Sequence, residues 1–418
     1  MSRVLVVGLA TSGRAAALLL ARQGRAVIAV DAAEVRADEL EAAGVEVRAP
    51  YDAAVTDIEL VVKSPGVPAT APPVAAAIEA GVPVISEIEL AAGLLENPLI
   101  AVTGTNGKTT TVELTAALLR AAGFPARACG NQGTPLSGLV GEVDPDEWLV
   151  VECSSFQLED TRDFHPRAAA LINITPDHLD RHGTLADYAA AKMRIFANQV
   201  LGDLAILPDG MDAPGGAPAR RVTGAPAPDA VAWSDGGLHL VGYGKLLDWD
   251  DVPLRGAHNR QNAMIAAALA AHAGAGGEGI AAGLRAFTGV PHRLEVVGVA
   301  DGVTYVNDSK ATNPDAAIAA LDAYPSGVHL IAGGRGKGTT FDALAAAADG
   351  VVRAYLIGET AADLAEALAA AGIAHERHPD LAAAVTAAAS GAGAGETVLL
   401  APAGASFDQF GSFEERGE

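Results

Sequence analysis

The stretch Ile100–Val112 reads IAVTGTNGKTTTV, and it predicts a strand, a phosphate-binding loop and a helix in succession. The glycine loop ends in Lys108-Thr109. Glycines let backbone N–H groups face a phosphate, and the dipole of the following helix adds to the positive field. We expect Lys108 to reach the β- and γ-phosphates of a nucleotide and the Thr109 hydroxyl to ligate Mg²⁺. A kinase, a motor and a ligase could all begin in this way, and a plain glycine turn with a solvated lysine is the less favoured alternative.

Composition restricts the class of protein. A length of 418 residues suggests about two to three domains. The net charge of −23 argues against a nucleic-acid or anionic-membrane partner, because nothing supplies a broad basic face. Cys129 and Cys153 are the only cysteines and form neither a disulfide framework nor a metal-ligand spacing, so a reducing cytoplasm is expected. No apolar run reaches the length of a membrane span.

The chain alternates between short β-branched runs and Ala- and Leu-rich segments of helical period, which is typical of parallel α/β architecture. We predict three α/β domains. A Rossmann-like domain covers 1–88, a central P-loop ATPase-like domain with a mostly parallel sheet covers 89–289, and a second Rossmann-like domain covers 290–418. Segment 209–230 is rich in Gly and Pro and is predicted to be a surface loop. Segment 233–249 is predicted to form antiparallel hairpins.

A first glycine loop lies near the N-terminus. Gly8 and Gly13 bound a loop between a predicted strand and a helix, and Asp31 ends the next strand, where dinucleotide folds place a ribose-binding acid. Ala10 stands where the middle glycine of that fingerprint belongs, so a pyrophosphate could approach the backbone less closely. A nicotinamide enzyme and a tight turn without any ligand both fit this loop.

A series of further motifs accompanies the phosphate loop in a fixed order. Together they resemble the Mur ligases of peptidoglycan synthesis over nearly the whole chain. The phosphate loop alone would also fit folylpolyglutamate synthases, whereas NDSKATN and the SFDQF…FEERG tail are more specific to the branch of the family that adds D-glutamate. The matching segments are 104–111, 152–159, 175–183, 190–196, 257–263, 290–295, 307–314, 333–338 and 401–417.

The resemblance implies an ATP-dependent amide ligase. The γ-phosphoryl group of ATP would pass to the terminal carboxylate of UDP-N-acetylmuramoyl-L-alanine, and the amine of D-glutamate would attack the resulting acyl phosphate. This order is needed because a carboxylate is a poor electrophile until one oxygen becomes a good leaving group. The resemblance also implies two Mg²⁺ ions and a cytoplasmic enzyme, which we expect to be a monomer.

The resemblance further implies a role for individual residues. The catalytic residues would be Lys108, Glu152, His178 and Lys192. The metal ligands would be Thr109, Glu152, His178 and Lys192, the last as a carbamate. ATP would be held by Gly104, Thr105, Asn106, Gly107, Lys108, Thr109, Thr110, Asn259, Asn262, Arg293 and Asp308. The UDP-substrate would be held by Thr11, Ser12, Asp31, Ser64, Pro65, Gly66, Asn131, Gln157 and His178. D-Glutamate would be held by Lys310, Thr312, Lys337, Ser406 and Phe413.

Lys192 is the least obvious of these residues. A lysine in a helix is most often solvated. However, Tyr188, Ile195 and Phe196 lie three or four residues away, which indicates a partly apolar helix face. The matching family lysine reacts with CO₂ to form a carbamate, and a buried neutral amine next to cations suits that reaction.

Alternatives and departures remain. A Mur-type ligase that adds another amino acid, such as L-glutamate, shares the same chemistry. A nicotinamide-dependent oxidoreductase would rest on the first glycine loop, and a nucleotide-binding module without activity is the third reading. Ala32-Ala33 follow Asp31, where some relatives carry polar groups, so contacts to uridine are expected to differ. Relatives usually continue beyond the FEERG tail into another short helix, so packing of the third domain is also expected to differ.

Overall fold

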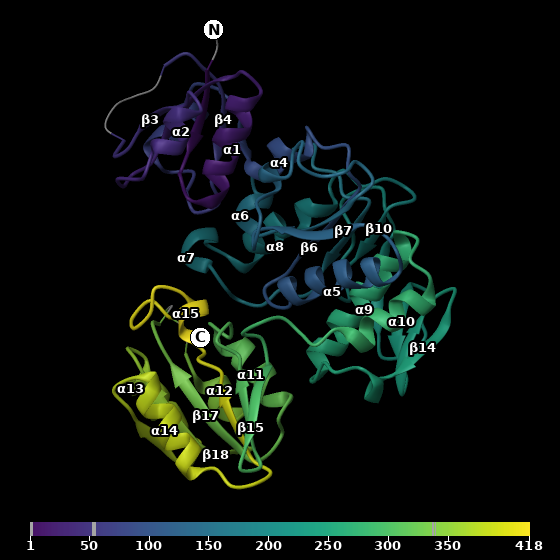
Figure 1. The fold of residues 1–418 in the computed structure, drawn as a ribbon, viewed down its shortest axis with the longest axis vertical. Coiled ribbons are helices and arrows are strands. Elements are labelled where there is room, and N and C mark those ends of the chain that lie inside the picture. The colour runs from purple at the N-terminus through teal and green to yellow at the C-terminus, as the bar shows by residue number, and fades with distance from the viewer. Residues whose placement is uncertain (1–2, 52–55, 337, 339) are drawn as a thin grey trace. The chain divides into compact units, whose positions relative to one another are not determined.

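The structure is a computed structural model that describes residues 3–51, 56–336, 338 and 340–418 (Figure 1). It divides into two compact units. The first comprises Met1–Asp251 and Asn262–Ala286, and the second comprises Val252–Gln261 and Phe287–Glu418. Three mostly parallel sheets confirm the predicted α/β fold class, whereas the boundaries at 88/89 and 289/290 stay predictions.

The first sheet is parallel and has the strand order β3-β2-β1-β4-β5. Its strands are β1 (Arg3–Val7), β2 (Ala26–Val30), β3 (Glu46–Arg48), β4 (Ile58–Lys63) and β5 (Val84–Ser86). Its helices are α1 (Thr11–Arg22), α2 (Asp38–Ala42) and α3 (Pro72–Glu79). The strand order reverses between β1 and β4, and in open parallel sheets ligands bind beyond the carboxyl ends of such strands.

The second sheet has the order β14-β13-β12-β11-β10-β9-β6-β8-β7. Its strands are β6 (Leu99–Thr103), β7 (Ala126–Gly130), β8 (Trp148–Glu152), β9 (Ala168–Leu171), β10 (Leu204–Ile206), β11 (Ala219–Thr223), β12 (Ala230–Ser234), β13 (Gly237–Leu240) and β14 (Gly244–Asp248). The helices around it are α4 (Glu87–Ala92), α5 (Lys108–Ala121), α6 (Ser155–Leu158), α7 (Leu179–His182), α8 (Leu185–Met193), α9 (Ala257–His272) and α10 (Gly277–Ala286). The central strands are nearly all buried, as expected of a sheet covered on both faces.

Two local predictions for this sheet had different outcomes. The antiparallel hairpins over 233–249 are confirmed, because β13 pairs antiparallel with both β12 and β14. The surface loop over 209–230 is wrong in part, because β11 lies within it and pairs in parallel with β10 and β12. Two adjacent arginines concealed this strand, and the stem of Arg221 is in fact buried.

The third sheet belongs to the second unit and has the order β15-β16-β20-β17-β18-β19. Its strands are β15 (Glu295–Ala300), β16 (Val303–Asn307), β17 (Val328–Gly333), β18 (Val351–Ile357), β19 (His375–Arg377) and β20 (Thr397–Leu400). Its helices are α11 (Pro314–Asp322), α12 (Asp342–Ala346), α13 (Ala361–Ala370), α14 (Leu381–Gly391) and α15 (Phe413–Gly417). Among the described strands of this sheet, only β15 is antiparallel to its neighbour. No described helix is long and apolar enough to cross a membrane.

Helix α4 follows the last strand of the first sheet directly and is fixed by its own acidic residues. The fully buried Glu87 accepts a hydrogen bond from the backbone N–H of Ser137 at 2.5 Å. The Glu89 carboxylate accepts two more from the N–H groups of Asp163 and Phe164. The second carboxyl oxygen of Glu87 has no hydrogen-bond partner among the described residues. Burial raises the pKa of Glu87 to about 7.

Glu87 should therefore make stability depend on pH. Its folded pKa of about 7 lies above the ordinary 4.5, so the folded state binds more protons between these values and the free energy of unfolding falls as pH rises through this window. The expected contribution is about 3 kcal/mol. Glu87→Gln cannot ionise and should stabilise the protein at pH 8 but not at pH 4.5, as measured by urea unfolding. Glu79→Gln, on an exposed part of α3, is the control, and an equal effect of Glu87→Gln at both pH values would contradict the assignment.

Candidate active site

The phosphate loop joins β6 to α5, as the sequence predicts. Gly104 and Gly107 both adopt positive φ, at 156° and 86°. The Lys108 ammonium donates hydrogen bonds to the carbonyl oxygens of Gly104 at 2.9 Å and Thr105 at 2.8 Å. The N–H of Thr105 donates to the side-chain oxygen of Asn173, which lies just after β9. The lysine thus lies across the loop whose backbone would face the phosphates.

Two asparagines from distant segments surround the same loop. The N–H of Asn106 also donates to Asn173, at 2.9 Å. A Cβ at Gly107 would lie 2.6 Å from the Oδ1 of Asn262, so both the positive φ and this close approach require glycine. Thr110 is buried in the first turn of α5. Asn262 therefore lies against the phosphate loop, a contact that the sequence alone could not place.

Glu152 ends β8, which pairs with β6 in the sheet. The Glu152 residue is only 2% exposed. One carboxylate oxygen accepts a hydrogen bond from the Thr109 hydroxyl at 2.6 Å, and the other accepts one from the amide of Asn131 at 2.9 Å. A hydroxyl and a carboxylate thus meet at the start of α5, the position where a nucleotide-bound cation is expected.

These oxygen donors fit Mg²⁺, which prefers hard oxygen ligands and commonly keeps water and phosphate oxygens in its shell. The described residues contain no group of three or more His, Cys, Asp or Glu side chains arranged to hold a metal. Thr109 and Glu152 could therefore supply only part of a coordination shell, and substrate oxygens or water would have to supply the rest.

Lys192 lies in α8 and is 1% exposed, so it is a buried lysine and not a solvated one. Its ammonium nitrogen lies 2.9 Å from the carbonyl oxygen of Gly104 and 4.4 Å from the ring centre of Tyr188. Burial, and secondarily the charge of Lys108, lowers the pKa of Lys192 to about 6. The Tyr188 hydroxyl in turn donates to the hydroxyl of Thr105. Helix α8 therefore presents a neutral amine to the phosphate loop near pH 7.

His178 precedes α7 and adopts a left-handed backbone conformation, with φ at 54°. Its ring packs edge-on against Phe156, and the ring of His182 stacks on the same phenylalanine. The His178 side chain is substantially exposed and its Nε2 lies 3.6 Å from Asp177. The backbone turn thus presents the imidazole at the surface, where a substrate can reach it.

The first glycine loop is held by its own neighbours. The Asp31 carboxylate accepts hydrogen bonds from the N–H groups of Leu9 at 2.6 Å and Ala33 at 3.0 Å. The Ser64 hydroxyl donates to the carbonyl oxygen of Gly8 at 2.8 Å. Asp31 and Ser64, both predicted to contact the UDP-substrate, therefore also hold the ends of β1, β2 and β4 together.

The other residues predicted for the UDP-substrate lie at strand and helix ends. Thr11 and Ser12 begin α1, and Pro65 and Gly66 follow β4. Gln157 is fully buried and completes a capping box with Ser154, while its amide nitrogen has no partner among the described residues. A buried amide without a partner is available to a ligand.

Arg181 is a residue that sequence reasoning missed. Its guanidinium donates to the carbonyl oxygens of Pro65 at 2.7 Å and Val67 at 2.9 Å. The buried ammonium of Lys63 pairs with Asp160 at 2.9 Å alongside. These contacts hold the loop after β4 against the segment that carries His178. The only signal was the position of Arg181 inside the motif TPDHLDRHG.

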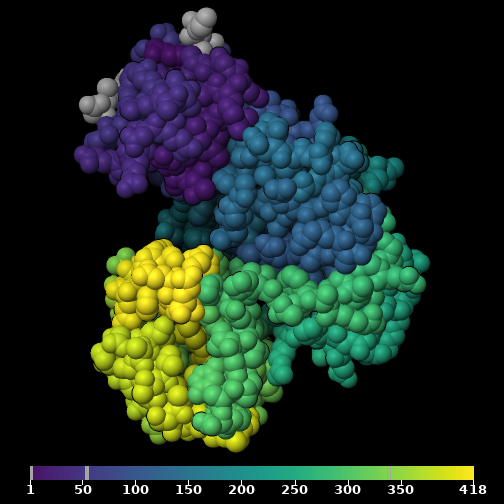
Figure 2. Space-filling view, viewed as in Figure 1, coloured from purple at the N-terminus to yellow at the C-terminus, as the bar shows by residue number. Residues whose placement is uncertain are grey.

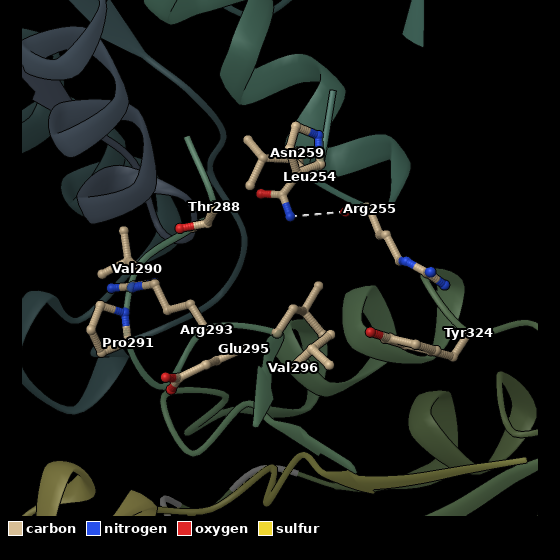
Figure 3. A pocket seen from close by; sticks show the side chains of 13 residues that line it. Leu254, Arg255, Asn259, Thr288, Val290, Pro291, Arg293, Glu295, Val296 and Tyr324 are labelled. Carbon is tan, nitrogen blue, oxygen red and sulfur yellow. Dashed lines mark hydrogen bonds between the residues drawn. The ribbon is translucent and has the colours of Figure 1, made fainter. Parts of the chain in front are cut away.

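The second unit contains a cavity of about 430 Å³ (Figure 3). Asn259 and Arg293 line it, as do Leu254, Arg255 and Tyr324. The amide of Asn259 donates to the carbonyl oxygen of Arg255 at 2.9 Å, which fixes its orientation. Apolar and cationic groups together suit a nucleotide base with its phosphates.

Asp308 is not among the residues that line this cavity. It is buried, accepts a hydrogen bond from the N–H of Leu294 at 3.3 Å, and lies near Arg293. Burial raises its pKa to about 7, against the opposing effect of Arg293. The ribose contact predicted for Asp308 stays a prediction.

The residues predicted for D-glutamate follow strands of the third sheet. Lys310 and Thr312 follow β16, and Ser406 follows the neighbouring parallel strand β20 and is buried. The ammonium nitrogen of Lys310 lies 3.5 Å from the ring centre of Phe413, which begins α15. Lys337 lies outside the described residues. The structure thus brings Lys310 and Phe413 into contact.

Comparisons with known proteins cover nearly the whole chain. The family models described as Mur ligase MurD-like N-terminal domain, Mur ligase middle domain, and Mur ligase glutamate ligase domain match residues 2–86, 102–270 and 292–404. A relative in Pelotomaculum thermopropionicum is 42% identical, over 100% of this chain and 96% of its own. The chain belongs to the Mur ligase family. A relative in Myxococcus xanthus is 45% identical, and the match again covers 100% of this chain and 96% of the relative. Both relatives are named UDP-N-acetylmuramoylalanine–D-glutamate ligase.

Solved structures share the fold of this Mur ligase. MurC, the UDP-N-acetylmuramate-alanine ligase of Thermotoga maritima, aligns with a TM-score of 0.61 at 20% identity, over 97% of this chain and 96% of its own. FolC of E. coli, solved in complex with DHPP and ADP, aligns with a TM-score of 0.59 at 20% identity, over 79% and 90%. At such identities the likeness shows a common fold and nothing about the substrate.

Proposed function

We propose that this Mur ligase joins D-glutamate to UDP-N-acetylmuramoyl-L-alanine and converts ATP to ADP and phosphate. The observation that carries the proposal is the cluster around the phosphate loop, where Lys108, the Thr109–Glu152 pair and Lys192 all contact one short segment. The full-length relatives named for this reaction supply the choice of substrates.

The reaction follows from these groups in two steps. A carboxylate oxygen of the UDP-substrate attacks the γ-phosphorus of ATP, and ADP leaves with the electrons of the broken P–O bond. The D-glutamate amine then attacks the acyl carbon, loses a proton, and phosphate leaves as the amide forms. Lys108 supplies positive charge where the transferring phosphoryl group gains negative charge.

We also propose that the site takes two Mg²⁺ ions, held by Thr109, Glu152, His178 and Lys192. Bound Mg²⁺ would neutralise charge on the nucleotide phosphates. Lys192 would serve as a carbamate, which its burial and its low pKa support because both favour the neutral amine. A carbamate supplies anionic oxygens, which an amine cannot.

One assay tests the function. Phosphate release is measured with UDP-N-acetylmuramoyl-L-alanine, ATP and Mg²⁺, without amino acid, with D-glutamate and with L-glutamate. We expect turnover with D-glutamate only. Preference for L-glutamate would make the D-specific assignment wrong and leave the ligase chemistry intact. Release that needs neither substrate would contradict the ligase itself. A monomeric state and a cytoplasmic location remain predictions.

The amino-acid pocket gives a separate prediction. Ser406→Ala should raise the KM for D-glutamate about tenfold or more, because it removes a hydroxyl predicted to bind a carboxylate, and bonds to charged groups contribute about 1.5–3 kcal/mol. The KM for ATP should change less than twofold. Ser390→Ala, an exposed serine on α14, is the matched control. Equal increases in both KM values would exclude Ser406 from the glutamate pocket.

A further inference from the structure

The C-terminal helix α15 carries a buried cation that the reaction above does not use. Arg416 is 3% exposed. Each of its three nitrogens donates one hydrogen bond: Nε to the Ser309 hydroxyl at 3.0 Å, one terminal nitrogen to the Ser309 carbonyl at 2.8 Å, and the other to the Gly404 carbonyl at 3.1 Å. Within the described chain no carboxylate forms an ion pair with it. Burial lowers the pKa of Arg416 to about 10, so the group remains charged at neutral pH.

The partners of Arg416 identify what it connects. Ser309 directly precedes Lys310, and Gly404 lies two residues before Ser406. These residues lie in the segments that follow the parallel neighbours β16 and β20. A single side chain on a third segment therefore bridges the two loops that carry predicted glutamate ligands. Figure 1 shows α15 beside one end of the third sheet, and Figure 2 shows the C-terminal segment, in yellow, on the surface of this unit.

The helix that carries Arg416 is itself fixed at both ends. The Ser412 side chain caps its first turn. The Ser309 hydroxyl donates to the carbonyl oxygen of Phe413 at 2.8 Å, and the amide of Asn307 donates to that of Gly417 at 3.0 Å. Since the Lys310 ammonium lies over the Phe413 ring, the same anchoring also sets the surroundings of that lysine.

Only arginine can make this bridge. Its planar guanidinium presents donors in several fixed directions, whereas lysine is a single point charge on a flexible stem. The hydrogen-bond partners of this buried cation are carbonyl oxygens and a hydroxyl, and the Asp408 carboxylate, which forms no ion pair with it, compensates its charge only in part. That charge favours an anionic ligand between the two loops.

We propose that Arg416 is a positioning residue for the amino-acid pocket, which sets Lys310 relative to Ser406 by bridging their loops and adds positive potential for a dicarboxylate. The inference rests on the proposed function for the identity of that dicarboxylate, D-glutamate. The bridging itself does not depend on the substrate.

The test uses the full-length protein with Arg416→Lys, which keeps the charge, and Arg416→Met, which removes it. We expect the KM for D-glutamate to rise at least tenfold in Arg416→Lys and further in Arg416→Met. The KM values for ATP and the UDP-substrate should stay within twofold. Arg353→Met, a partly exposed arginine on β18, is the control. A change below twofold in the D-glutamate KM of Arg416→Lys would overturn the proposal, as would equal increases in all three KM values.

Hydrogen exchange separates this proposal from the proposed function. Without substrate, Arg416→Lys should speed amide exchange in segments 307–312 and 401–406 and leave the first sheet unchanged. Unaltered exchange in both segments would overturn the bridging even if the native enzyme is active.

If the Arg416 variants do not fold, Ser309→Ala provides a second test because it removes one hydrogen-bond acceptor of Arg416. Ser309→Ala should also raise the KM for D-glutamate, by a smaller factor, and no rise would count against the role of Arg416. A native enzyme inactive with D-glutamate would refute the function alone.

Discussion

Lys108→Ala should fold normally and lose about 100- to 1000-fold in turnover, because it removes a charge that acts on the transferring phosphoryl group. Such a loss corresponds to roughly 3–4 kcal/mol of barrier. Phosphate release under saturating substrates measures it. Lys245→Ala, a partly exposed lysine on β14, is the matched control and should retain full turnover. Near-normal phosphate release by a folded Lys108→Ala variant would contradict the prediction that this loop acts on ATP.

A second measurement separates two causes of that loss. Lys108 also bonds to the carbonyl oxygens of Gly104 and Thr105, so its removal takes two contacts from the loop. If the loop merely collapsed, ATP binding would weaken as much as turnover falls. A role in phosphoryl transfer predicts instead that ATP binding, measured calorimetrically, weakens much less than turnover.

Lys192→Ala should be nearly inactive and partly rescued by acetate. The buried neutral amine of Lys192 would attack CO₂, lose a proton and become a carbamate, and acetate can occupy the space that alanine leaves. Phosphate release with increasing acetate measures the rescue, and depletion of bicarbonate should slow the native enzyme. Full activity of Lys192→Ala, or an unmodified ammonium at Lys192 in a crystal structure with metal and nucleotide bound, would exclude the carbamate.

A volume-matched variant sharpens this test. Lys192→Met fills the space without supplying an anionic oxygen. We expect it to be as inactive as Lys192→Ala and not to respond to acetate. Equal rescue of both variants would mean that acetate acts elsewhere.

Local pattern was enough to predict the phosphate loop, the mostly parallel sheets and the partly apolar helix face around Lys192. In each case the deciding residues lie within a few positions of one another, as with the helical spacing of Tyr188 and Lys192. The role of Arg181 could not be predicted, because its partner Pro65 lies 116 residues away in the loop that follows β4. The close approach of Asn262 to Gly107 could not be predicted for the same reason, because the two residues are far apart in the sequence. Strand β11 was missed because its pairing partners, and not its own composition, make it a strand.

The resemblance predicted which ligand each site residue would contact, but not the hydrogen bonds that these residues make within the protein. Asp31 was expected to contact a ligand, and in the structure its carboxylate accepts hydrogen bonds from the backbone N–H groups of Leu9, in the first glycine loop, and of Ala33. No sequence pattern distinguishes Glu87 from the other acidic residues, yet it is fully buried. Such burial depends on tertiary packing, which spacing along the chain does not record.

The division between the two compact units limits how the protein can be dissected. The second unit contains Val252–Gln261 as well as everything from Phe287 onward, and the first unit resumes between these two stretches. A fragment that starts at the predicted boundary, residue 290, would lack Leu254, Arg255 and Asn259, which form part of the cavity wall. No single cut in the chain releases the second unit alone, because a cut before Val252 keeps Asn262–Ala286 of the first unit and a cut before Phe287 loses Val252–Gln261. A recombinant fragment that starts at Phe287 would need this short stretch joined to its new N-terminus.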